Sequence, residues 1–169
     1  PSIDATAQAA HLLLRVDPAR FEGVIDACAR YVAAAQRPEG GWRGLWFCAD
    51  LMTTFQALRL LAARGDAYGA HVRRAADFLA ETQGHDGSWS GSVLQTSAAV
   101  RALRSLGPGA DDAVRRAKAW LRARATAGGW AGEPLIYYWF ETAPGQKVLF
   151  HCRDKGKITS AWAKLALAA

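Results

Sequence analysis

The chain repeats one motif three times, and this repeat limits its fold more than any single residue does. Each copy has an aromatic–aliphatic pair, then a Gln (Ala125 in the third copy), then Gly-x-Trp. The three copies end at Trp42, Trp89 and Trp130. A period of about forty residues is typical of stacked helical hairpins that share one core. The sequence therefore predicts an all-α domain built from repeated helix pairs.

A second element recurs between these motifs: a Thr or Ser three residues before an Ala, followed by an aliphatic run. The copies begin at Thr6, Thr54, Thr96 and Ser160. These segments are apolar almost all round, which is typical of a helix buried on every side. They are the predicted inner helices.

The segments that alternate with them have apolar residues at helical spacing and one charged face, which predicts outer helices. They lie around residues 21–36, 67–83 and 111–124. Asp66 and Asp111 are the predicted N-caps, and Gly65 and Gly107 should end the preceding inner helices. In the repeated turns we expect Gly to allow a tight bend, Gln to bind backbone groups at a helix end, and Trp to pack over the junction.

The interval before Ser160 is longer and breaks the helical pattern. Residues 135–140 and 148–152 read as strands, and residues 143–146 read as the turn between them. The sequence therefore predicts a small β-hairpin near 134–152, within an insertion of residues 133–155, at one mouth of the helical domain.

Composition limits the number of domains, the kinds of partner and the redox compartment. A length of 169 residues with 51% hydrophobic residues suits one domain with a large core. The net charge of +6 indicates either a solvated Arg-rich face or attraction to an anionic ligand such as a diphosphate. No basic run is interleaved with aromatics, so nucleic acid is not an expected partner. Three distant Cys without a CxxC pair argue against a disulfide framework and for a reducing compartment.

No apolar stretch reaches about 18 residues, so we expect no transmembrane segment. We expect a cytoplasmic protein, with attachment to a membrane surface as the alternative.

The motif that ends at Trp42, Trp89 and Trp130 resembles the QW motif of class II terpene cyclases, the squalene-hopene cyclase-like family, along nearly the whole chain. The resemblance implies an α/α toroid, in which inner helices line a central hollow. Complete toroids of the family have more helix pairs than this chain. We therefore expect residues 1–169 to be a partial ring, the C-terminal part of a β-type domain, completed by a missing N-terminal segment or a second subunit.

The resemblance also points to an acid. Class II cyclases protonate an alkene or epoxide with the middle Asp of Asp-x-Asp-Asp-Thr-Ala, which shrinks to Asp-Cys-Thr-Ala-Glu in sterol cyclases. Here Asp4 falls at the acid position, while Ser2 and Ala5 replace flanking carboxylates. An alkene is a weak base and needs clustered carboxylates, whereas an epoxide tolerates a lone Asp. The alternative for Asp4 is a helix cap.

By repeat symmetry, Asp50 should lie at the same rim as Asp4 and supply a second carboxylate, with helix capping again the alternative. A cyclase cavity also needs ring faces that stabilise carbocations. The candidates are Trp46, Phe47, Phe55, Tyr138, Phe140 and Trp162, for which core packing is the alternative. Lys147 and Arg153 are the candidates to hold a diphosphate, unless they form a solvated rim.

The resemblance implies a class II terpene cyclase that starts a carbocation cascade in a polyprenyl diphosphate or a polyprene epoxide. It implies no cofactor, apart from Mg²⁺ if the substrate is a diphosphate. One alternative is a toroid without catalysis, acting as a scaffold or a lipid-binding module. The other is a zinc-dependent prenyltransferase-like enzyme, in which Cys48, Asp50, His151 and Cys152 would supply the ligands.

Overall fold

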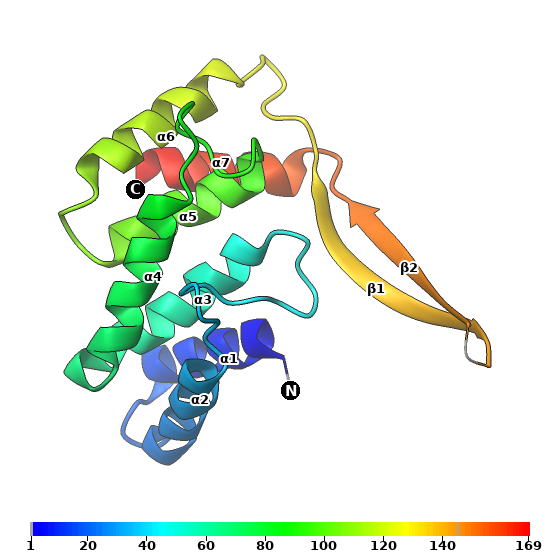
Figure 1. Cartoon of the computed structure of the whole chain (residues 1–169). Helices are drawn as coiled ribbons and strands as arrows, with labels where there is room; N and C mark the ends of the chain where they lie inside the picture. The colour runs from blue at the N-terminus through cyan, green and yellow to red at the C-terminus, as the bar shows by residue number, and fades with distance from the viewer. Residues whose placement is uncertain (1, 145) are drawn as a thin grey trace.

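The computed structural model describes residues 2–144 and 146–169, except for the side chains of residues 138–142 and 147–151. The helices form two layers (Figure 1). The inner layer consists of α1 (Ile3–Val16), α3 (Asp50–Ala63), α5 (Val93–Ser105) and α7 (Lys157–Ala168). The outer layer consists of α2 (Glu22–Ala34), α4 (Gly69–Glu81) and α6 (Asp111–Ala123). Each inner helix packs on the next, and each outer helix contacts both inner helices that it connects. The predicted alternation of inner and outer helices is confirmed.

The middle inner helices hold the core. Leu58, Leu60 and Leu61 of α3 are fully buried, as are Leu94 and Val100 of α5. Helices α1 and α7, at the two ends of the row, are covered less completely. They expose large apolar side chains: Leu12 at 62%, Val16 at 67%, Ile158 at 43% and Leu165 at 51%.

The three repeated Trp side chains cap the outer helices. Each indole N–H donates to a carbonyl in the last turn of the preceding outer helix: Trp42 to Val32 (2.7 Å), Trp89 to Leu79 (3.0 Å) and Trp130 to Leu121 (2.9 Å). Carbonyls in the last turn of a helix lack the usual partner four residues on, so they can accept a further donor. The indoles are at most 7% exposed, so the prediction that they pack over the junctions is confirmed.

The recurring Thr or Ser of the inner helices anchors the same turns. The backbone N–H of each repeated Trp donates to a hydroxyl: Trp42 to Thr54 (3.1 Å), Trp89 to Thr96 (3.0 Å) and Trp130 to Ser160 (3.0 Å). Each turn is therefore tied to the outer helix before it and to the inner helix after it.

The Gln side chains bind backbone groups at a helix end, as predicted, but the helix is the next outer one in the chain. Gln36 donates to the carbonyls of Gly40 (2.7 Å) and His71 (2.9 Å), and His71 lies in the first turn of the next outer helix. Gln83 does the same in the second turn, donating to Gly87 (2.9 Å) and Ala113 (2.8 Å). The Gln amide thus joins two hairpins instead of closing its own helix.

The predicted N-caps Asp66 and Asp111 are wrong. Asp66 lies inside a short 3-10 helix, η1 (Gly65–Tyr68), that delays the start of α4. Asp111 is the first residue of α6, after the N-cap Ala110, and its carboxylate pairs with Arg104. Gly65 follows α3 and Gly107 follows α5, at φ +69° and +91°, so both predicted helix ends are confirmed.

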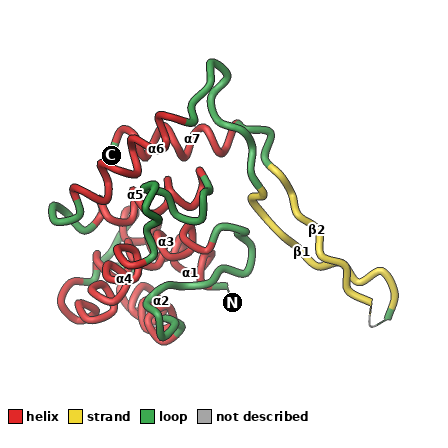
Figure 2. The backbone as a smooth tube through the Cα atoms, turned by 45° about the horizontal axis from the view of Figure 1, so that its top comes forward, coloured by secondary structure: helices red, strands yellow, loops and turns green. Residues whose placement is uncertain are grey.

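The predicted β-hairpin is confirmed, with longer strands than expected. Strands β1 (Pro134–Ala143) and β2 (Gln146–Arg153) pair antiparallel and extend away from the helices (Figures 1 and 2). The base of the hairpin is fixed to the loop before α3. The Cys48 N–H donates to the Leu135 carbonyl, and the Tyr137 N–H donates to the Trp46 carbonyl, both at 3.0 Å.

The described helices include none that is both long and apolar enough to cross a bilayer.

Candidate active site

Asp4 lies in the first turn of α1 and is only 1% exposed. Its Oδ1 accepts the Ala5 N–H at 3.0 Å, and its Oδ2 accepts the Trp46 N–H at 3.3 Å. The N-cap of α1 is Ser2, so Asp4 is not the capping residue. The second bond comes from a loop 42 residues away in the chain. The loop before α3 therefore fixes the orientation of the Asp4 carboxyl.

Gly44 brings Asp4 close to a second polar group, the hydroxyl of Thr53. A Cβ added to Gly44 would lie 2.3 Å from Thr53 Oγ1 and 3.0 Å from Asp4 Oδ2. Thr53 is fully buried, and its hydroxyl has no hydrogen-bond partner among the described residues. The absence of a side chain at residue 44 is what allows this carboxyl and this hydroxyl to approach the same point.

Asp50, the first residue of α3, lies at the same rim and is half-buried. Burial raises the pKa of Asp50, against the opposing effects of Arg43, Arg37 and the Gly44 N–H that it accepts. Its N-cap is Ala49, so Asp50 is not the cap either. The Gly44 peptide thus contacts Asp50 through its N–H and lies beside Asp4.

Tyr137 of β1 closes this group from the hairpin side. Its hydroxyl donates to the Gly44 carbonyl at 2.9 Å. Burial raises the pKa of Tyr137, and the nearby carboxylates of Asp50 and Asp4 add to the effect. The structure therefore brings both predicted aspartates together, around one glycine.

The predicted aromatic residues do not form one wall within the described part of the chain. Trp46 is 48% exposed, and Phe47 is half-buried beside β1. Phe55 and Trp162 meet edge to face at 5.7 Å, farther along the inner helices, with Arg101 over both rings. The side chains of Tyr138 and Phe140 lie outside the described residues.

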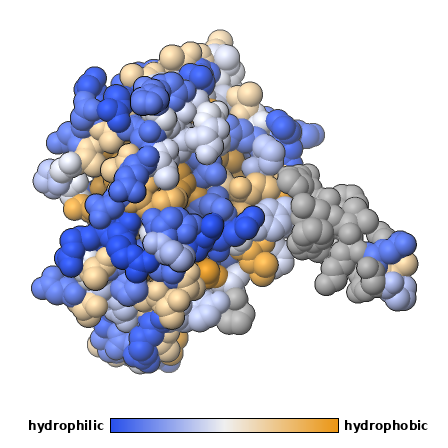
Figure 3. Space-filling view, viewed as in Figure 1, coloured by the Kyte–Doolittle hydropathy of each residue, from blue (hydrophilic) through white to orange (hydrophobic). Residues whose placement is uncertain are grey.

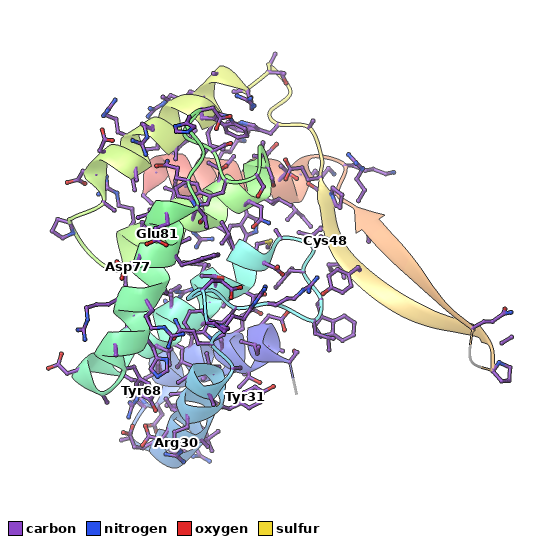
Figure 4. All side chains as sticks on the ribbon, viewed as in Figure 1. Arg30, Tyr31, Cys48, Tyr68, Asp77 and Glu81 are labelled. Atoms are coloured by element: carbon purple, nitrogen blue, oxygen red, sulfur yellow. The ribbon has the colours of Figure 1, made fainter. Side chains whose placement is uncertain are left out.

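The predicted diphosphate rim has little support in the described residues. Arg153 is exposed, and its guanidinium donates to the Gly132 carbonyl at 2.9 Å. The side chains of Lys147 and His151 lie outside the described residues. Among the side chains that are described, no three His, Cys, Asp or Glu gather as a metal site would require. Cys48 lies in the loop next to β1 (Figure 4) and Cys152 is exposed; both are free thiols.

Sequence reasoning missed three groups that shape the rim. Gly44 and Thr53 carry no motif of their own, although Thr53 stands next to the recurring Thr54. Glu133 marks only the start of the insertion in the sequence. In the structure it caps α5, accepting the Ser92 hydroxyl (2.5 Å) and the N–H groups of Val93 (2.6 Å) and Leu94 (3.0 Å).

The outer side of the molecule offers a different cavity. A groove of about 490 Å³ between α4 and α6 is lined by Asp77, Leu106, Pro108 and Arg116, among others. Asp77 and Glu81 lie on the exposed side of α4 (Figure 4), and hydrophilic residues are spread over this face (Figure 3). Neither predicted carboxylate, Asp4 or Asp50, lines this groove, so it is not the candidate active site.

Comparison with known proteins places the repeat in a family. The family model of the squalene-hopene cyclase C-terminal domain matches residues 1–130. The squalene–hopene cyclase of Bradyrhizobium diazoefficiens is 27% identical over 96% of this chain and 27% of its own length. The lanosterol synthase erg7A of Aspergillus fumigatus is 34% identical over 42% of this chain and 10% of its own length. The chain therefore spans about a quarter or less of these relatives.

Solved structures show the same fold. A type II terpene cyclase from Scytonema, in complex with the product merosterolic acid A, superposes with a TM-score of 0.78 over 99% of this chain and 52% of that one, at 19% identity. The ent-copalyl diphosphate synthase of Streptomyces platensis gives 0.75 over 99% and 33%, at 24% identity. The two-layered helices are thus part of the α/α toroid of terpene cyclases, as predicted. With the family model covering most of its length, this chain belongs to the squalene-hopene cyclase C-terminal domain family of class II terpene cyclases.

Proposed function

We propose that this chain supplies the proton donor of a class II terpene cyclase and that Asp4 is the donor. One observation carries the proposal: an almost completely buried carboxyl, at the family's acid position, has both oxygens fixed by backbone N–H groups. A general acid is effective when its geometry is set before the substrate arrives.

The proposed step begins with a proton on Asp4. The proton moves to the terminal alkene carbon, or to the epoxide oxygen, of a polyprenyl substrate. The alkene electrons form the new C–H bond, or the epoxide C–O bond breaks, and a carbocation and the Asp4 carboxylate remain. Neighbouring alkenes then attack the cation and close rings, and the cascade ends by loss of a proton or capture of water.

Thr53 and Gly44 are the proposed positioning residues. The buried, unpartnered Thr53 hydroxyl borders the same point at Gly44 as Asp4 Oδ2, and it is proposed to turn and donate to the carboxylate that proton transfer leaves behind. Asp50 is proposed to support the acid from the same rim, since burial raises its pKa and favours its neutral form.

The cavity in which this happens is proposed to need more chain than these residues. The chain spans about half of the Scytonema cyclase, and its terminal helices α1 and α7 expose Leu12, Val16 and Leu165. An upstream segment or a second subunit that packs on these side chains would close the hollow and exclude water from Asp4.

The test is Asp4→Asn, measured in the complete protein as its gene encodes it. Asparagine keeps the size of the side chain, and its one amide oxygen can still accept one of the two N–H groups, but it has no acidic proton to give. We expect cyclisation of a polyprenyl diphosphate or epoxide to fall by at least about 10²–10⁴-fold, with substrate binding retained. The matched control is Asp66→Asn, an exposed carboxylate remote from the rim, which should leave turnover unchanged.

Turnover of Asp4→Asn at the wild-type rate would place the acid elsewhere. A complete protein that binds polyprenyl chains but cyclises none of the substrates tested would favour the lipid-binding alternative.

A further inference from the structure

Three consecutive inner helices carry a basic side chain at the same repeat position. His11, Arg59 and Arg101 each stand five residues after the recurring Thr of their helix. Because α1 packs on α3 and α3 packs on α5, these three residues lie on neighbouring helices. Arg59 Nη2 lies within hydrogen-bonding distance of His11 Nε2, and the guanidinium groups of Arg59 and Arg101 lie 5.0 and 4.6 Å from the Phe55 ring centroid.

No described carboxylate neutralises this cluster. The ion pairs among the described residues include neither Arg59 nor Arg101, nor the adjacent Arg15. Burial lowers the pKa of Arg59 and of Arg101, and the neighbouring guanidinium of Arg15 or Arg59 lowers each further. Cation–π contacts with Phe55 and Trp162 offset part of the free-energy cost of burying these charges, but they do not neutralise them.

His11 adds a donor to the cluster. Burial and the two nearby guanidinium groups lower the pKa of His11, which favours the neutral ring. A neutral ring that accepts from Arg59 at Nε2 carries its proton on Nδ1. That Nδ1 is buried and has no partner among the described residues. An N–H donor without an acceptor is costly unless a ligand supplies one.

Two cavities flank the pair formed by His11 and Arg59, and both are lined by these two residues. One, of about 310 Å³, is completed by Gln8, Leu12, Arg15 and Gln56. The other, of about 290 Å³, is completed by Ala62, Ala63 and Ser105. Space for a ligand therefore exists beside the guanidinium groups of Arg59 and Arg15, while Arg101 approaches the cluster through the Phe55 ring and lines neither of these two cavities.

The cluster shares a helix face with the proposed acid. His11 and Arg15 follow Asp4 by seven and eleven residues on α1, which at ~100° per residue places all three within about 20° of one line. At ~1.5 Å per residue, the cluster begins about 10 Å from Asp4 along the axis and ends about 16 Å from it.

We propose that His11, Arg59 and Arg101, with Arg15 at their edge, form an anion-binding site that holds the phosphate or carboxylate head group of an isoprenoid substrate. Guanidinium groups suit such oxyanions because they donate in a fixed fork. The anion site stands on this cluster alone. Its assignment to a substrate head, with the hydrocarbon chain running toward Asp4, rests on the proposed function.

The test measures binding by calorimetry in the complete protein, without turnover. The probes are inorganic pyrophosphate, geranylgeranyl diphosphate and the uncharged geranylgeraniol. We expect the diphosphate ester to bind at least tenfold more tightly than either pyrophosphate or the alcohol. Arg59→Gln and Arg101→Gln should each weaken ester binding at least tenfold, and Arg59→Lys should weaken it less. Arg30→Gln, an exposed arginine of the outer helix α2 (Figure 4), is the matched control and should bind as wild type.

Circular dichroism of each variant separates lost binding from lost folding. Wild-type affinity in both folded Gln variants, or no binding of any anion, would overturn the site. Equal affinity for pyrophosphate and for the ester would overturn the head-group assignment in favour of a free-anion site. Asp4→Asn should bind the ester as wild type does, so failure of this proposal and failure of Asp4 as the acid are read from different measurements.

Discussion

The two halves of the inner helices differ in how completely their polar groups are satisfied. At the N-terminal ends, neighbouring repeats supply partners for the backbone N–H groups: Gln95 accepts the Leu51 N–H at 2.9 Å, and Glu133 caps α5, while the buried Thr53 hydroxyl beside Asp4 stays unpartnered among the described residues. In the C-terminal half of α1 and α3 and the middle of α5, the basic cluster of His11, Arg15, Arg59 and Arg101 has no described counter-charge. The first end is a hydrogen-bonded frame around Asp4, whereas the cluster has a buried donor, His11 Nδ1, without a described partner. The proposed function would use both ends, one to orient the head of a flexible chain and the other to protonate its far end.

The largest expected effect tests the frame itself. Trp89→Ala removes an indole that is 1% exposed and caps α4, so the free energy of unfolding should fall by roughly 3–5 kcal/mol in denaturant titration. Trp46→Ala, at a Trp that is 48% exposed, is the control and should cost much less. A loss below about 1 kcal/mol for Trp89→Ala would show that the turns do not hold the hairpins together.

A smaller change breaks the frame only at the acid. In Gly44→Ala the new methyl group would press on Thr53 Oγ1 and Asp4 Oδ2, so one of them must move. A shift near 1 Å at a reacting group can cost about 10²-fold in rate. We expect kcat to fall by that order while affinity for the anionic head is kept. Gly23→Ala is the control, because nothing lies within 4 Å of its added Cβ. A wild-type kcat in Gly44→Ala would show that the loop around Gly44 does not set the position of the Asp4 carboxyl.

The next prediction tests one hydrogen bond of the frame, the one that the Trp89 N–H donates to the Thr96 hydroxyl. Thr96→Val leaves the buried Trp89 N–H without its acceptor, which should cost about 1–3 kcal/mol of stability. Thr96→Ser keeps the hydroxyl and should recover most of the loss. Thr82→Val, at an exposed Thr, is the control and should change the free energy of unfolding little in denaturant titration. If Thr96→Val and Thr82→Val proved equally mild, the repeated hydroxyl would not be an anchor.

The smallest effect concerns charge at the rim and depends on pH. Burial raises the pKa of Asp50 in the fold above its ordinary value of 3.8, so the folded state holds its proton more tightly than the unfolded state. Stability from this group is therefore present below that ordinary value and is lost as pH rises through the folded pKa. Asp50→Asn should be slightly more stable than wild type at pH 7, and the advantage should shrink as the pH falls toward 4. An advantage that stays constant with pH in urea titrations would contradict this assignment.

The repeats made much of the fold predictable from sequence. Gly-x-Trp and the recurring Thr are local signals, and the helical periodicity between them is local too, so the inner and outer helices and the hairpin at 134–152 could all be placed. Asp66 and Asp111 failed as N-caps because cap preference is weaker than the context that starts α4 with a 3-10 turn and draws Asp111 to Arg104.

The acid position could be named from the sequence, but its surroundings could not. Asp4 receives the Trp46 N–H across 42 residues, and Tyr137 reaches the Gly44 carbonyl across 93. Contacts over such distances along the chain have no recognisable sequence motif. The same holds for the basic cluster: the sequence shows His11, Arg59 and Arg101 one per repeat, but only the packing of α1, α3 and α5 decides that their charges meet on one face. Sequence fixes what repeats along a helix, because periodicity is local; which side chains share a site is decided by how the helices pack.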